Sequence, residues 1–230
     1  MDDKLFIEHE HTGKTVLKNV TFFGYAESHS DDAEYIGAYQ SAQLVAKSGR
    51  TVINGGGPGV MYAASKGAKD AGGRVEVVYY VPTNATHFEG RHEPTIQFAD
   101  AEYQEANYIE RTRRLIEMGD AYVVFNGGTG TVSEFAMAWC IARLYFGHHK
   151  PLIFYGAFWK NILDAFWNNM RVREEEYRVF KYAVTPEQVV QHLNDYENLF
   201  NNHKDHKVDK DCVGAECDLF LEHLDHKEKV

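Results

Sequence analysis

Two glycine-rich segments are the parts of this 230-residue sequence best suited to chemistry. One reads Asn54-Gly55-Gly56-Gly57-Pro58-Gly59-Val60-Met61, and the other reads Asn126-Gly127-Gly128-Thr129-Gly130-Thr131-Val132-Ser133-Glu134. Glycine lets a backbone turn tightly and approach a ligand closely, and the unpaired N–H groups at the start of a helix favour phosphate. Each segment follows an expected strand and opens an expected helix. The pair therefore predicts two ligand-binding turns at one edge of a parallel sheet, although each alone is equally consistent with a tight strand-to-helix turn.

The glycine patterns disfavour two common nucleotide-binding classes. The dinucleotide fingerprint needs G-x-G-x-x-G after the first strand, whereas the first expected strand here leads into Gly24-Tyr25-Ala26-Glu27-Ser28. This disfavours an NAD-dependent oxidoreductase. The chain also lacks G-x-x-x-x-G-K-[ST], so a P-loop NTPase is not expected.

Charged residues lie on the expected helix before the second glycine segment and at the end of that segment. Arg111 and Arg114 share one face of an expected helix, and Arg113 points elsewhere. Because arginine binds phosphate and developing negative charge bidentately, one or two of them are candidates to reach a substrate; the alternative is a solvated basic face. Glu134 lies in the first turn of the following helix. It is either a carboxylate facing the cleft or a helix-capping charge.

Strands and helices alternate along the chain, which predicts a Rossmann-like α/β fold with a doubly wound parallel sheet. The expected strands span 20–24, 51–53, 74–81, 95–98, 121–125, 151–155 and 179–184. The expected helices span 31–48, 60–71, 103–118 and 158–170; another starts in the 127–131 glycine segment and runs to about 146, and a last one opens at Pro186. We expect an N-terminal arm over 1–18, a single domain over 19–200 and a polar C-terminal appendage over 201–230 with one short helix.

The ordered motifs resemble those of the LOG ("lonely guy") family, whose members were once labelled lysine decarboxylases. The 126–134 segment is similar to that family's PGGxGTxxE signature, and 55–68 is similar to its GGGPGIMEAANxGA segment. Arg111 precedes Asp120-Ala121 at the family's spacing, and the first strand, Trp139 and the His149-Lys150-Pro151 run also match. The resemblance covers about 20–195.

This resemblance implies hydrolysis of the N-glycosidic bond of a nucleoside 5′-monophosphate, such as AMP or a cytokinin nucleotide, to free base and ribose 5-phosphate. Glu134 would stabilise the oxocarbenium-like transition state and orient water, together with Arg111. Neither a metal nor another cofactor is implied. The resemblance also suggests a homodimer or larger homo-oligomer. An apolar contact between copies and packing in the core explain Trp139, Leu144, Tyr145 and Phe146 equally well. The expected binding residues are Gly127, Gly128, Thr129, Gly130, Thr131 and Arg114 for the phosphate, and Gly56, Gly57 and Met61 for the sugar and base.

Three departures from the family pattern stand out. Asn126 replaces the signature proline, Thr112 replaces the lysine that usually follows the arginine, and the segment after 200 has no counterpart. Of these, Thr112 bears on substrate preference because it removes a charge beside the site. Lysine decarboxylation is not expected, since neither glycine segment holds a lysine for a Schiff base. A nucleotide-binding sensor or carrier without catalysis remains the alternative, and it would need neither Glu134 nor Arg111.

Composition sets the class of protein. The chain is 44% hydrophobic and 25% charged with a net charge of −10, so we expect a globular protein whose acidic surface is unsuited to nucleic acid or an anionic membrane. The acidic start, the three cysteines and the absence of a long apolar run predict a cytoplasmic location. The tail holds metal-ligand residue types that complete no standard zinc pattern: His203, His206, Cys212, Cys217, His223 and His226.

Overall fold

The computed structural model describes residues 4–7, 16–82 and 91–202. Within them, seven strands form one parallel sheet in the order β4-β3-β2-β1-β5-β6-β7. The order runs outward from β1 in both directions, which is the doubly wound arrangement that the sequence predicts. The strands are β1 (Asn19–Phe23), β2 (Thr51–Asn54), β3 (Val75–Tyr80), β4 (Ala101–Glu105), β5 (Ala121–Val124), β6 (Leu152–Tyr155) and β7 (Phe180–Ala183).

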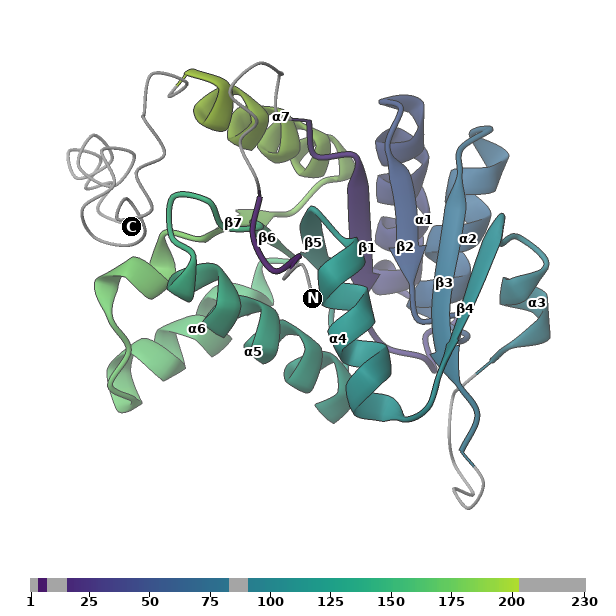
Figure 1. The fold of residues 1–230 in the computed structure, drawn as a ribbon, viewed down its shortest axis with the longest axis horizontal. Coiled ribbons are helices and arrows are strands. Elements are labelled where there is room, and N and C mark those ends of the chain that lie inside the picture. Colours follow the sequence, from purple (N-terminus) through teal and green to yellow (C-terminus); the bar gives the residue numbers. More distant parts are fainter. Residues whose placement is uncertain (1–3, 8–15, 83–90, 203–230) are drawn as a thin grey trace.

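Helices cover both faces of the sheet (Figure 1). One face carries α1 (Ala33–Lys47), α2 (Val60–Asp70) and α7 (Pro186–Asn202), with the short α3 (Glu93–Ile96) beside α2. The other face carries α4 (Tyr108–Met118), α5 (Thr129–Leu144) and α6 (Phe158–Asn169), with the 3₁₀ turn η1 (Glu174–Tyr177) against α5. The central strands are therefore buried on both sides, and all four residues of β5 are buried.

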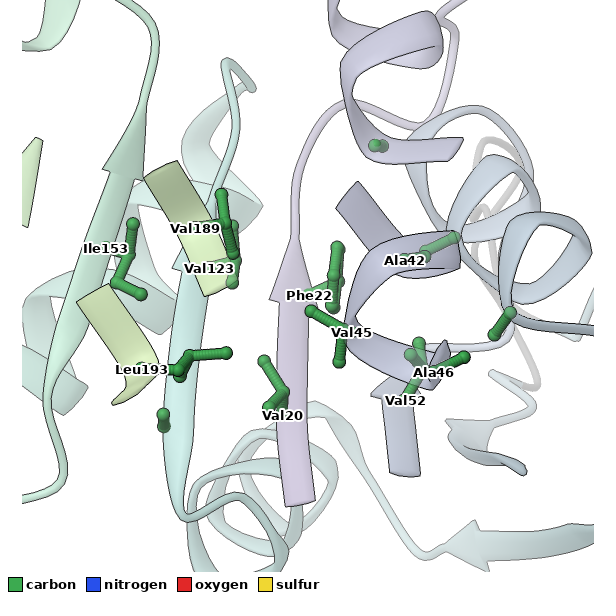
Figure 2. Close-up of a cluster of buried hydrophobic side chains, with 14 of the residues drawn as sticks. Val20, Phe22, Ala42, Val45, Ala46, Val52, Val123, Ile153, Val189 and Leu193 are labelled. Atoms are coloured by element: carbon green, nitrogen blue, oxygen red, sulfur yellow. The ribbon is translucent and has the colours of Figure 1, made fainter. Parts of the chain in front are cut away.

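On the α1 and α7 side, apolar residues of these helices pack against apolar residues of the strands and form a buried core (Figure 2). Val20 and Phe22 of β1 lie against Val45 of α1, while Val189 and Leu193 of α7 cover Val123 and Ile153. Small residues let α1 and α2 pack closely. At Gly67 an added Cβ would overlap the backbone carbonyl of Tyr39, so the two helix backbones meet there.

The sequence-based elements are confirmed for most of the chain and wrong in one region. A strand was expected at 95–98, but Glu93–Ile96 is the helix α3, whose Pro94 occupies the first turn where proline is tolerated. The fourth strand is β4, Ala101–Glu105. A helix was expected from 103, but α4 begins at Tyr108, after Asn107 accepts a hydrogen bond from the Glu110 amide. The edge strand β4 escaped prediction because its half-exposed Ala-Glu-Tyr-Gln-Glu sequence has little apolar character.

At the amino edge of the sheet, residues of the expected arm join the core. Leu17 is fully buried and Ile7 donates a backbone hydrogen bond to His148. Arg50, just before β2, donates to the Leu17 carbonyl and to the side chains of Asn194 and Glu197 on α7. The expected tail lies outside the described residues from 203 onward.

Candidate functional site

The strand order brings the two glycine turns together. β1 lies between β2 and β5, and the turns follow those two neighbours at the carboxyl edge of the sheet. The segment after β1 links them, since Tyr25 donates its amide hydrogen to the Asn126 carbonyl (2.9 Å) and accepts one from the Val60 amide (2.9 Å). This is the topological switch point, where doubly wound sheets bind ligands.

The first glycine turn is held by its own side chains and by α3. Gly56 and Gly59 have φ of +69° and +62°, a left-handed conformation that favours glycine. Asn54 accepts a hydrogen bond from the Gly56 amide (2.9 Å), and Thr95 donates to the Gly57 carbonyl (2.8 Å). These contacts fix the turn and already use the carbonyl of Gly57, a residue expected on the sugar and base side.

Arg111 is the residue that joins both halves of the site. From α4 it donates to the carbonyls of Val78 (3.2 Å) and Gly55 (3.3 Å), and its Nη2 lies 3.9 Å from the Met61 sulfur. A Cβ at Gly55 would overlap this guanidinium, so glycine is required for the arginine to fit. Arg111 thus fastens the first glycine turn to β3 and α4.

Glu134 faces Arg111 from the first turns of α5. Nη1 of Arg111 donates to Glu134 Oε1 at 3.0 Å, and both side chains are only 8% exposed. Burial raises the pKa of the Glu134 carboxyl above its ordinary value of 4.5, and the charge of Arg111 opposes that shift. Within the described residues, Oε1 is the oxygen that takes a hydrogen bond, which leaves Oε2 for a ligand or water.

The second glycine turn is open, in that most of its residues are exposed to solvent, whereas the glycines of the first turn are buried and we call that turn closed. Gly128 caps α5 without a side-chain hydrogen bond, and Gly128, Thr129 and Gly130 are exposed. The first amides of α5 have no partners inside the helix and carry its positive dipole end. Thr131 is buried, and its hydroxyl lies so close to Gly127 that a Cβ there would overlap it. The turn therefore offers backbone donors to an anion.

The other expected site residues are placed differently. Met61 is buried under the Arg111 guanidinium. Arg114 turns toward β4, where it pairs with Glu105 (3.1 Å) and lies over the Tyr103 ring (4.3 Å), so it is not brought to the second glycine turn. Thr112 is 2% exposed and follows Tyr108 by one turn of α4. Lys150 caps α4 by donating to the carbonyls of Ile116 (3.0 Å) and Glu117 (2.9 Å), which gives it a structural role.

Tyr108 is a site residue that the sequence analysis missed. Its ring lies 5.7 Å from the Arg111 guanidinium carbon, and its hydroxyl lies 3.0 Å from Ser133 Oγ on α5. Its spacing of three residues from Arg111 puts both on one face of α4, and this spacing was the available signal.

In the described part of the chain, no group of three or more His, Cys, Asp or Glu side chains is arranged to hold a metal ion. None of the described helices has both the length and the apolar character needed to cross a bilayer.

The fold defines a doubly wound α/β protein, with a candidate ligand site at the switch point. The chain belongs to the SLOG cluster4 family, whose model matches residues 17–179. The LOG resemblance inferred from the motifs is thereby confirmed. An uncharacterized protein of Archaeoglobus fulgidus is 33% identical over 108 residues, which make up 47% of this chain and 66% of that relative. The match thus falls just short of two thirds of that relative's length.

Solved structures share the fold at low sequence identity. The molybdenum cofactor binding protein of Rippkaea orientalis has a TM-score of 0.58 at 23% identity, covering 77% of this chain and 96% of that one. The molybdenum cofactor carrier protein of Chlamydomonas reinhardtii has a TM-score of 0.51 at 18% identity, with the same coverage. DNA processing protein A of Helicobacter pylori, described with a single-stranded DNA binding mode, has a TM-score of 0.52 at 14% identity, covering 78% and 82%.

Proposed function

We propose that this protein hydrolyses the N-glycosidic bond of a nucleoside 5′-monophosphate, with AMP as the reference substrate. The observation that carries the proposal is the buried Arg111–Glu134 pair, which lies between a closed glycine turn and an open one. A structural ion pair would not need an open anion-binding turn beside it.

The proposed chemistry follows from this placement. The 5′-phosphate binds the first amides of α5, around Gly127–Thr131, through the helix dipole and backbone N–H groups. The ribose then lies beside Glu134, whose carboxylate stabilises positive charge at C1′ as the bond to the base breaks. The same carboxylate orients the attacking water through Oε2. Arg111 holds Oε1 and so fixes the direction of the carboxylate.

The test is a panel of nucleoside monophosphates incubated with purified protein and scored for free base by chromatography. AMP should be cleaved at least about 10²-fold better than adenosine in kcat/KM, the scale of two charge-assisted hydrogen bonds to the phosphate. Equal rates for the two substrates would remove the phosphate anchor from the proposal.

A second candidate function is binding without turnover, as a sensor or carrier of a phosphorylated small molecule. The descriptions of two structural neighbours as molybdenum cofactor binding and carrier proteins favour it. Calorimetry together with the base-release assay distinguishes the two functions, because a carrier binds AMP or another phosphorylated ligand but releases no base. We expect no binding of an oligodeoxynucleotide, given the net charge of −10. Because one neighbour is described with single-stranded DNA, fluorescence anisotropy with a single-stranded oligonucleotide belongs in the same panel.

We also propose that two copies associate through α5. Its outward face carries Val132, Ser133, Ala136, Met137, Cys140 and Leu144, with the partly exposed Arg143 as the charged residue of the last turn. Of the contact residues expected from the sequence, Leu144 is 53% exposed, whereas Phe146 is buried and Trp139 packs on Tyr177 and Phe180. Met137→Glu should lower the mass measured by light scattering if this face joins two copies, and an unchanged mass would exclude it.

A further inference from the structure

We propose that Tyr108 is a positioning residue that couples the Arg111–Glu134 pair to the phosphate-binding turn. Its ring holds Arg111, and its hydroxyl holds the turn. This inference rests on the proposed function, because it assigns a task within the same site. Tyr108 is the first residue of α4, where the chain enters from β4.

The ring of Tyr108 contacts the guanidinium of Arg111. Its centroid lies 5.7 Å from the guanidinium carbon of Arg111, within the range of a cation–π contact. The Tyr80 ring meets it edge-on at 6.1 Å, so the ring is backed by the end of β3. The guanidinium is thus held by the Gly55 and Val78 carbonyls, by Glu134 and by an aromatic face.

The hydroxyl of Tyr108 lies within hydrogen-bond distance of the first turn of α5. Ser133 Oγ donates to the Gly130 carbonyl at 2.7 Å, so its own proton is engaged. The Tyr108 hydroxyl, 3.0 Å from Ser133 Oγ and 3.3 Å from the Gly130 carbonyl, therefore acts as the donor. Burial and the nearby Glu134 charge raise the pKa of this phenol above 10, so it keeps its proton in the neutral range.

These two contacts predict separable effects. Losing the hydroxyl frees the turn that carries the phosphate-binding amides, but leaves the ring on Arg111. Losing the ring also releases the guanidinium, which fixes the direction of the Glu134 carboxylate. The first change should act on ligand binding, and the second should act in addition on the chemical step.

The experiment compares Tyr108→Phe and Tyr108→Leu with a matched pair at Tyr103. Tyr103 also lies under an arginine, Arg114, and its hydroxyl reaches Glu76, but on β4 away from the glycine turns. Tyr108→Phe should raise KM for AMP about 3–10-fold, the scale of one lost hydrogen bond, with kcat within about twofold. Tyr108→Leu should also lower kcat about tenfold and move the acid limb of the kcat profile to higher pH. Tyr103→Phe and Tyr103→Leu should do neither.

Binding separates this inference from the proposed function. By calorimetry, Tyr108→Phe should weaken AMP about 3–10-fold and leave adenosine unchanged. If the wild type binds AMP but releases no base, the proposed function fails while this phosphate-selective loss still supports the coupling. Equal losses for AMP and adenosine, no loss for either, or a wild type that binds neither would overturn the coupling. Should Tyr108→Leu fail to fold, the Tyr108→Phe comparison decides alone.

Discussion

Two buried arginine–glutamate pairs lie at opposite edges of the same sheet. Arg50–Glu197 joins the start of β2 to α7 at 2.8 Å, and Arg111–Glu134 joins α4 to α5 at 3.0 Å. In the first pair Glu197 Oε1 accepts from Arg50 and also from the Leu17 amide, and Arg50 donates further to the Leu17 carbonyl and to Asn194. In the second pair the arginine also donates to the Gly55 and Val78 carbonyls, whereas Glu134 Oε1 accepts from Arg111 alone among the described residues.

The surroundings of the two buried ion pairs differ. At the amino edge, none of the described helices begins beside the pair, and Arg50 fastens residue 17 and α7 to the sheet. At the carboxyl edge, the pair lies beside the start of α5 and the glycine turns, where ligands bind in this fold class. The two pairs therefore differ in the edge of the sheet that they occupy, and the proposed function uses only the pair at the carboxyl edge.

The largest expected effect breaks the amino-edge pair. Arg50→Met leaves the Glu197 carboxylate without its cation at a site where the side chains are 6% and 14% exposed. The free energy of unfolding should fall by about 3–5 kcal/mol, measured by urea denaturation. The exposed Arg74→Met, which loses only a contact with Glu76, is the control and should change it little. A small effect at Arg50 would mean that the network does not anchor α7.

The next effect tests the carboxyl-edge pair by charge alone. Glu134→Gln keeps the shape and an amide oxygen for Arg111, but removes the negative charge. We expect kcat for AMP to fall about 10²–10³-fold, the loss typical of one preorganised electrostatic group, with AMP affinity and melting temperature close to those of the wild type. A variant with full turnover would reduce Glu134 to a structural residue like Glu197.

A third prediction concerns pH. Glu134 must be ionised to stabilise positive charge, so activity should fall as the pH drops through its raised pKa, above 4.5. Since the folded-state pKa is the higher one, this group's contribution to stability declines as the pH rises from 4.5 to that value. Arg111→Gln removes the charge that lowers this pKa and should move the acid limb to higher pH. Arg113→Gln, on the exposed side of α4, should leave it in place.

The smallest effect is expected from the tail. Removing residues 203–230 keeps all of α7, including the buried Tyr196 and Phe200, so circular dichroism and the melting curve should be unchanged. Removing residues 196–230 instead deletes those two rings and Glu197, and should lower the melting temperature. A large loss in the shorter deletion would show that the tail belongs to the core.

Much of this architecture could be predicted because it depends on patterns of residues that are close together in the sequence. The buried strands β1, β5 and β6 are short apolar runs, and the glycine segments mark where each turn opens a helix. The region between 91 and 107 could not, since β-branched Thr95 and Ile96 are buried from a helix and β4 is a half-exposed edge strand. In the site, Arg111 and Glu134 were predicted, whereas Arg114 was expected at the phosphate and pairs with Glu105 instead.

The sequence by itself determined the order of the elements, the two glycine turns and the residue types that could act beside them, because these depend on spacing along the chain. Only the tertiary structure decided which of the arginines meets Glu134, that Gly55 must lack a side chain to admit the guanidinium, and that Tyr108 touches both halves of the site. The physical reason is that strand order places β2 and β5 on either side of β1. Contacts between residues far apart in the chain follow from that order, and no local pattern encodes it.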